Sequence, residues 1–464
     1  MKTEDRTEHI TEPTPVQRTG HRRDLAAAGA GVVLVTAAAV IGRAIENADH
    51  TLYVHWPPLL ASWYPHIGPG TAAAPVVAAA VVAYGPVLAV RLRWRTLLLS
   101  CYAASLAWVF SLALIDGWGR GLAERLTTKH EYLRVIGRFD DIGAALHGFT
   151  DHILIGPPGN WPAHVAGHPP GATLTFVLLD RIGLGGGAWA GVWCIVTGAT
   201  AAVAALVAVR TVADEHTARR AAPFVVLAPV AVWAGASADG YFTAVAAWSV
   251  TLLALAATRT VRSPAAAALG AGLLFGLVCY LSYGLTLIAL LLVAVLVLTR
   301  TARPLPLVAL GALVVPAAFT LAGFNWWEAY QLLLKRYSQG AGGFRPYSYW
   351  VWANLACTAI AVGPATLAGL RRTAAGAPGA ALGLRTGATA PRQRLVLLVS
   401  VALLTLLAAD LSGMSKAETE RIWQPFILWL LPATALLPAR GRRGWLAAQA
   451  VVALAVNHLL WTGW

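Results

Sequence analysis

The residues best suited to chemistry are concentrated in one polar segment, residues 116–171, which separates two long apolar runs. Its carboxylates are Asp116, Glu124, Glu131, Asp140, Asp141 and Asp151. Asp116 directly follows an apolar run, and Glu131 lies in Lys129-His130-Glu131. A positioned carboxylate suits the work of a general base, which takes a proton from an acceptor hydroxyl. Asp116 and Glu131 are therefore the two candidate catalytic residues.

A second polar segment, residues 412–425, precedes a late apolar run. It contains Lys416 and Arg421 with Glu420 between them. Charged side chains near a helix end often do no more than reach the membrane interface. The functional interpretation is that Lys416 and Arg421 bind a phosphate, because arginine offers two parallel hydrogen bonds and lysine a point charge.

Other polar and aromatic side chains could contact a sugar. Asp239 lies in Ser237-Ala238-Asp239-Gly240, where it either caps a helix or holds a sugar hydroxyl. The segment 324–349 is rich in Trp and Tyr, which either form an interfacial belt or stack on sugar faces. The predicted substrate-binding residues are His130, His168, Asp239, Arg345, Tyr347 and Glu420.

Evidence for a metal site is limited to one histidine pair. His164 and His168 have a ligand-like spacing, but Pro162 and Pro169 bracket them and no third ligand is fixed by spacing. A divalent metal is a weak candidate, and no firm cofactor is predicted. The four cysteines lie inside apolar runs without a CxxC spacing, which is typical of small buried residues.

Membrane helices must position these groups. Of the 464 residues, 58% are hydrophobic and 12% are charged, whereas soluble proteins contain about 25% charged residues. Unpaired strands cannot face lipid, so the composition predicts an all-α polytopic membrane protein. Its apolar runs lie near residues 24–43, 71–90, 96–115, 169–184, 185–209, 221–236, 241–258, 264–281, 284–299, 304–323, 349–370, 395–411, 422–438 and 444–461.

The net charge of +14 arises from arginines at the ends of apolar runs, a pattern that sets membrane orientation and does not indicate nucleic acid. Basic residues accumulate on the side that holds residue 1, which predicts a plasma-membrane protein with a cytoplasmic N-terminus. Residues 1–23 are expected to form a disordered cytoplasmic tail. Residues 24–464 are expected to form a transmembrane domain of about 13 helices.

With this orientation, residues 116–171 form a large extracytoplasmic loop. Apolar residues spaced by three or four positions over 132–152 predict an amphipathic helix lying in the interface. The 169–184 run begins with Pro-Pro and carries Asp180 and Arg181. We expect it to be short or re-entrant, which requires that protein covers it.

Several short motifs resemble the GT-C superfamily of integral-membrane glycosyltransferases, in particular the protein O-mannosyltransferase and aminoarabinose-transferase type, in an actinobacterial form. The matching elements run in the same order over residues 96–438. They are His130-Glu131-Tyr132, the 132–152 helix, His168-Pro169-Pro170-Gly171, Asp239 and Arg421-Ile422-Trp423-Gln424-Pro425. The chain departs from the family in two ways: His130-Glu131 stands in place of an Asp-Glu pair, and an additional helix pair precedes residue 96.

The resemblance implies an inverting transfer of a monosaccharide from a polyprenyl-phosphate donor to a glycan, lipid or protein acceptor. The sugar would be a hexose or a pentose, with mannose and arabinose as candidates. The donor phosphate would lie near Lys416 and Arg421, and Asp116 or Glu131 would be the base. A transporter or flippase of lipid-linked sugar and a non-catalytic cell-envelope scaffold are the alternatives.

Overall fold

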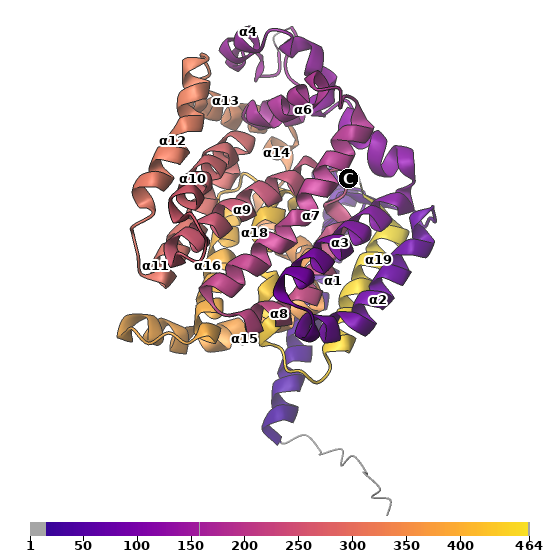
Figure 1. Ribbon diagram of the computed structural model, residues 1–464. Helices are drawn as coiled ribbons and strands as arrows, with labels where there is room; N and C mark the ends of the chain where they lie inside the picture. Colours follow the sequence, from indigo (N-terminus) through magenta and orange to yellow (C-terminus); the bar gives the residue numbers. More distant parts are fainter. Residues whose placement is uncertain (1–14, 157, 463–464) are drawn as a thin grey trace, which may run out of the picture.

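A computed structural model describes residues 15–156 and 158–462. Figure 1 shows a bundle of long helices with short helices, including α4 (Ile142–His147) and α6 (Gly171–Arg181), across one end. We call this end the loop face, because it carries residues 116–171. The chain enters at the opposite face, where α1 (Pro15–Asp49) begins.

The other elements up to the middle of the chain are β1 (Ala61–Trp63), α2 (Gly70–Arg91), α3 (Trp94–Ala113), α5 (Ala163–Gly167), α7 (Gly187–Val212), α8 (Glu215–Val226) and α9 (Ala238–Thr258). The second half contains α10 (Pro264–Leu281), α11 (Ile288–Thr299), α12 (Leu305–Leu321), α13 (Trp326–Gln339), α14 (Ala341–Phe344), α15 (Tyr347–Thr386), α16 (Pro391–Leu411), α17 (Thr419–Ile422), α18 (Gln424–Ile427), α19 (Arg442–Leu459) and β2 (Leu460–Thr462). Short 3₁₀ or π segments are η1 (Leu114–Asp116), η2 (Gly119–Ala123), η3 (Arg125–Thr127), η4 (Tyr132–Phe139), η5 (Thr150–His152), η6 (Pro229–Trp233), η7 (Tyr283–Leu287) and η8 (Leu431–Leu436).

The predicted all-α membrane fold is confirmed. Among the described residues, eight helices are long and apolar enough to cross a membrane, and α12 with α13 would add a ninth if this pair, bent by 78°, is one span. The predicted number of about 13 crossings is not confirmed. Apolar runs near 221–236, 284–299 and 422–438 are divided into shorter helical pieces.

Two predictions about the loop face have different outcomes. The 169–184 run forms α6, whose 11 residues make a helix of about 16 Å, roughly half the bilayer core. It is therefore short, as expected. The single amphipathic helix over 132–152 is wrong, because the chain forms η4, α4 and η5 instead. Asp141 interrupts it by capping α4, where its carboxylate accepts a hydrogen bond from the backbone N–H of Ala144 at 2.9 Å.

The predicted tail also has a different boundary. Helix α1 begins at Pro15, so residues 15–23 belong to this helix. Residues 1–14 lie outside the described residues. At the other end of the chain, β2 pairs antiparallel with β1, with Ser62 opposite Trp461. This pairing ties the end of α19 to the connection between α1 and α2.

Helix α9 lies at the centre of the bundle, and 78% of its most apolar 18-residue stretch is buried inside the protein. Glycine permits its close approach to α7, since a Cβ at Gly198 would lie 3.2 Å from the carbonyl carbon of Gly240. Small residues at such contacts let membrane helices pack through their backbones. The first turn of α9, with Asp239, is thereby held rigidly at the loop face.

Helix α15 is interrupted inside the bundle at Gly363, whose φ of +74° is left-handed. The side chain of Gln449 on α19 covers the break. Its amide donates to the carbonyl of Val362 at 2.9 Å and its oxygen accepts from the N–H of Ala365 at 3.3 Å. Irregular backbone at membrane depth requires such partners, because lipid offers none.

A buried ion pair fixes α1 against α15. The carboxylate of Asp24 is fully buried and lies 2.6 Å from Arg371 and 2.6 Å from Arg372. The two guanidinium groups are themselves partly exposed. The pair therefore supplies the counter-charge that a buried carboxylate requires.

We predict that Asp24→Ala lowers the melting temperature of the protein in detergent. Removing one partner of a buried ion pair is destabilising by about 3 kcal/mol, because the other charges stay behind uncompensated. Thermal unfolding measured by tryptophan fluorescence tests this, with Asp49→Ala, at an exposed acid of the same helix, as the control. Equal melting of the Asp24→Ala and Asp49→Ala variants would contradict the role of the pair.

Candidate functional site

Three charged residues form the centre of the loop face, and we call Asp239, Glu418 and Arg421 the central cluster. The guanidinium of Arg421 is only 7% exposed and forms ion pairs with both carboxylates. It contacts Asp239 through Nη1 and Glu418 through Nη2, the latter at 3.0 Å. Burial lowers the pKa of Arg421, but Asp239, Glu418 and the nearby Glu131 outweigh burial and raise it. Arg421 is therefore a permanent cation.

Each member is positioned by local structure. Asp239 lies in the first turn of α9, and the actual cap is Ser237, whose hydroxyl also donates to Asp239 Oδ2 at 3.1 Å. Glu418 and the preceding Ala417 both have positive φ, of 62° and 73°. Left-handed backbone at two successive non-glycine residues is uncommon and clusters at functional sites. It turns the chain into α17 so that Glu418 and Arg421 project together.

Glu131 forms a second pair beside this cluster. It is 1% exposed, and its Oε1 lies 2.9 Å from His164 Nδ1. Its Oε2 is buried and accepts no hydrogen bond from the residues that the structure describes. A buried carboxylate oxygen without a donor is costly. Such an oxygen is available to accept a proton or a hydrogen bond from a bound molecule.

The ring of His168 contacts His164, a member of this pair. Its Nδ1 lies 2.7 Å from the carbonyl oxygen of His164 and 3.2 Å from the hydroxyl of Tyr132. Burial lowers the pKa of His168 to about 4, so the ring is neutral at physiological pH. A carbonyl only accepts, which assigns the ring proton to Nδ1 and leaves Nε2 as an acceptor.

A cavity of about 650 Å³ opens next to these pairs. We call it the loop cavity; the polar residues of its lining are Lys129, His130 and Asn160, together with Arg336 and Tyr337 of α13. Arg336 Nη2 donates to the carbonyl of Trp161 at 3.3 Å. Its Nη1 is buried without a hydrogen-bond partner among the described residues. The loop cavity is thus lined by cations, one of which has an unsatisfied donor, and this suits an anion.

Asp116 occupies a separate cluster. Its carboxylate lies 2.9 Å from Arg120, 3.5 Å from Arg125 and 3.0 Å from His66 Nε2. Both of its oxygens face cations. Burial is the main cause that lowers the pKa of Arg125, and both Asp116 and Glu131 oppose it. Arg125 pairs with Asp116, and of the two candidate bases only Glu131 pairs with a histidine beside the loop cavity.

The predicted phosphate ligand Lys416 lies at the edge of the cavity. Its ammonium donates to the carbonyl of Gly342, a cavity-lining residue, at 2.8 Å. Arg345 donates to the carbonyls of Leu52 at 2.9 Å and Lys416 at 2.6 Å. Arg345 therefore links the two chain segments that contain these residues. The hydroxyl of Tyr347 similarly donates to the carbonyl of Leu411 at 3.3 Å.

Glu420 lies away from the cavity lining. It is fully buried, and both carboxylate oxygens lack a hydrogen-bond partner of normal geometry among the described residues. Burial is the main cause that raises the pKa of Glu420 to about 7. Glu420 therefore holds its proton more strongly than an ordinary glutamate does.

The sequence did not single out Glu418 or Arg336 as site residues. It also did not predict that His164 pairs with Glu131. Glu418 is three residues from Arg421, a spacing that signals a pair on one helical turn. Arg336 follows a run of aromatic and apolar residues on α13, and its contact with the 160–162 segment has no local signal. Within the described part of the chain, no group of three or more His, Cys, Asp or Glu side chains is arranged to hold a metal.

No protein-family model matches the sequence, and no curated protein matches it. Solved structures of the oligosaccharyltransferase of Archaeoglobus fulgidus are similar in fold. The apo form has a TM-score of 0.50 and 14% identity, and the match covers 78% of this chain and 56% of that one. The form tethered to an acceptor peptide has a TM-score of 0.48 and 14% identity, covering 78% and 55%. The form with an inhibitory peptide and a dolichol-phosphate has a TM-score of 0.46 and 13% identity, covering 79% and 56%.

The chain thus spans just over half the length of the structures it matches. A structural match at 14% sequence identity establishes the fold but does not establish an activity. The comparison shows that the fold of this protein is similar to that of the oligosaccharyltransferase, and the predicted all-α membrane fold is confirmed.

We predict that Glu420 makes stability depend on pH. Its raised pKa means that the folded protein holds a proton that the unfolded chain releases above its ordinary pKa of 4.5. The stabilisation is therefore complete below about pH 4.5 and is lost as pH rises through about 7. Melting curves from pH 5 to 8 are expected to fall for the wild type and to stay flatter for Glu420→Gln. Glu328→Gln, at an exposed acid of α13, is the control; a parallel fall in both variants would contradict the assignment.

Proposed function

We propose that the protein transfers a monosaccharide from a polyprenyl-phosphate donor to an acceptor hydroxyl at its loop face. The observation that carries the proposal is the unsatisfied oxygen of buried Glu131 beside a cavity lined by cations. A base next to an anion site is the minimum that such a transfer requires. The fold, shared with an oligosaccharyltransferase, supports it by analogy.

We propose that the donor phosphate enters the loop cavity, where Arg336, Lys129 and the cavity-edge Lys416 face it. Arg421, a permanent cation, lies near Glu131. The prenyl chain would extend from the loop face along the membrane helices. Arginine and lysine at the phosphate lower the energy of the departing phosphate, because its negative charge grows as the glycosidic bond breaks.

In this proposal Glu131 Oε2 removes the proton of the acceptor hydroxyl. The hydroxyl oxygen forms a bond to the anomeric carbon, and the bond from that carbon to the phosphate oxygen breaks. Polyprenyl phosphate leaves with the electron pair, and the sugar inverts its configuration. His164, at 2.9 Å from Oε1, orients the carboxylate. Glu131 is a better base candidate than Asp116, whose two oxygens face Arg120, Arg125 and His66.

Asp239 and Glu418 fix Arg421 and are placed to accept hydrogen bonds from sugar hydroxyls. His130, which lines the cavity, adds a neutral ring, since burial and then the neighbouring His164 and Lys129 lower its pKa. A hexose or a pentose would fit; mannose and arabinose are candidates, and the acceptor would be a glycan, lipid or protein. We place the loop face outside an actinobacterial plasma membrane, because arginines such as Arg220, Arg371 and Arg442 collect at the opposite face.

We predict that Glu131→Gln lowers the rate of transfer roughly 10²–10⁴-fold, as expected for the loss of a general base. Transfer from radiolabelled polyprenyl-phosphate sugar by purified protein measures this, with binding of the donor as a second readout that should persist. Glu124→Gln, at an exposed acid of the same loop, is the matched control. Full activity of Glu131→Gln with loss in Asp116→Asn would assign the base to Asp116, and no transfer by the wild type would contradict the proposed function.

A further inference from the structure

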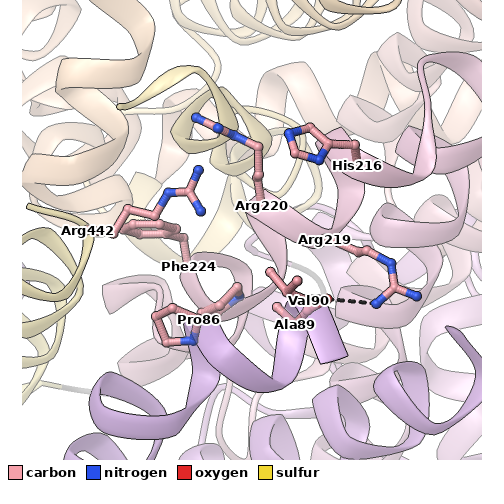
Figure 2. Close-up of a pocket in the computed structure, with 9 residues that line it drawn as sticks. Pro86, Ala89, Val90, His216, Arg219, Arg220, Phe224 and Arg442 are labelled. Carbon is pink, nitrogen blue, oxygen red and sulfur yellow. Dashed lines mark hydrogen bonds between the residues drawn. The ribbon is translucent and has the colours of Figure 1, made fainter. Parts of the chain in front are cut away.

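A second polar pocket lies at the opposite face, between α2, α8 and α19. We call it the arginine pocket. It encloses about 110 Å³ and is lined by Pro86, Ala89, Val90, His216, Arg219, Arg220, Pro223, Phe224 and Arg442. Figure 2 shows Arg220 and Arg442 on the same side of the pocket near Phe224, whereas Arg219 points away toward the end of α2. The mechanism proposed for the loop face uses none of these residues.

Two of its arginines carry charge that the described protein does not neutralise. Arg219 is paired with Glu215 at 2.7 Å and donates to the carbonyl of Ala89 at 2.7 Å. Arg220 donates only to carbonyls, those of Ala435 and Leu437. Arg442 has a buried Nε without a hydrogen-bond partner in the ranges that the structure describes. Neither Arg220 nor Arg442 forms an ion pair with a described carboxylate.

Arg220 lies in an environment that disfavours its positive charge. Burial and then the neighbouring Arg442, Arg392 and Arg372 lower the pKa of Arg220 to about 10. Nearby carboxylates are already used: Glu215 pairs with Arg210 and Arg219, and Asp24 pairs with Arg371 and Arg372. An anion in this pocket would relieve the repulsion.

An apolar groove continues from the arginine pocket along the bundle. It encloses about 270 Å³, and it shares Ala89 and Pro223 with the pocket. Its lining is almost entirely apolar, from Val81 and Leu88 of α2, Leu97 and Cys101 of α3, and Val226 of α8. A ligand that fits both spaces must combine a negatively charged head with a hydrocarbon chain.

We propose that the arginine pocket binds the phosphate of an anionic phospholipid whose acyl chain lies in the α2–α3–α8 groove. A phosphodiester offers oxygens to Arg442 and to the remaining N–H groups of Arg220, and guanidinium binds such oxygens in a bidentate manner. The acyl chain would then lie against the membrane-facing side of the helices. A free phosphate would satisfy the arginines but would leave the groove without an occupant.

Binding of dioleoyl phosphatidylglycerol to the full-length protein in detergent, measured by native mass spectrometry, tests this. We expect saturable binding that exceeds that of dioleoyl phosphatidylcholine. Arg442→Gln is expected to weaken it roughly tenfold, the order of one charge-assisted hydrogen bond. Arg442 makes no hydrogen bond through Nε, so this variant should fold; a melting curve confirms it. Arg440→Gln, an exposed arginine just before the same helix, is the matched control with the same change in net charge.

Equal binding by the Arg442→Gln and Arg440→Gln variants would overturn the proposal. Complete competition by millimolar glycerol 3-phosphate would also overturn it, because the site would then bind a free phosphate. Equal binding of the neutral lipid would show that the groove alone selects the ligand and would contradict the role of the arginines. These results do not depend on sugar transfer, so they do not bear on the proposed function.

Discussion

The organisation of the loop face depends on one buried cation. Arg421 is enclosed by protein and can keep its charge there only because Asp239 and Glu418 lie against it. The ion pair with Asp239 joins segments 182 residues apart. It fixes the 412–425 segment to the first turn of α9, the most buried helix of the bundle. Removing either carboxylate would leave an uncompensated charge at the place where the other site residues meet.

The remaining features of the site follow from that constraint. Glu131 lies near Arg421 with its side chain buried, and its partner His164 is partly exposed. Lys129 and His130, which line the loop cavity, directly precede Glu131 in the chain, so the cavity adjoins the Glu131–His164 pair. Residues within the segments 129–130 and 155–167 and residues of α13 and α14 line the loop cavity.

The sequence was sufficient to predict the class of fold. Long apolar runs required helices, and the Pro-Pro start of the 169–184 run indicated a short one. The predicted continuous helix over 132–152 is wrong because Asp141 caps α4 and divides the segment into short helices. The apolar spacing persists across these short helices. The pairing of Asp239 with Arg421 had no local signal, since the contact is set by packing of α9. The choice between Asp116 and Glu131 also needed three dimensions, because each carboxylate is defined by its partners. Arg345 and Tyr347 are of residue types suited to sugar binding, and in the structure both donate hydrogen bonds to carbonyls of distant segments.

The most direct test of the central claim is a cryo-electron microscopy structure of the Glu131→Gln variant with a polyprenyl-phosphate monosaccharide. We expect the phosphate in the loop cavity, within hydrogen-bonding distance of Arg336 or Lys416, and the anomeric carbon facing the side chain at position 131. A donor bound with its phosphate at the Asp116 cluster, or at the opposite face, would contradict the account.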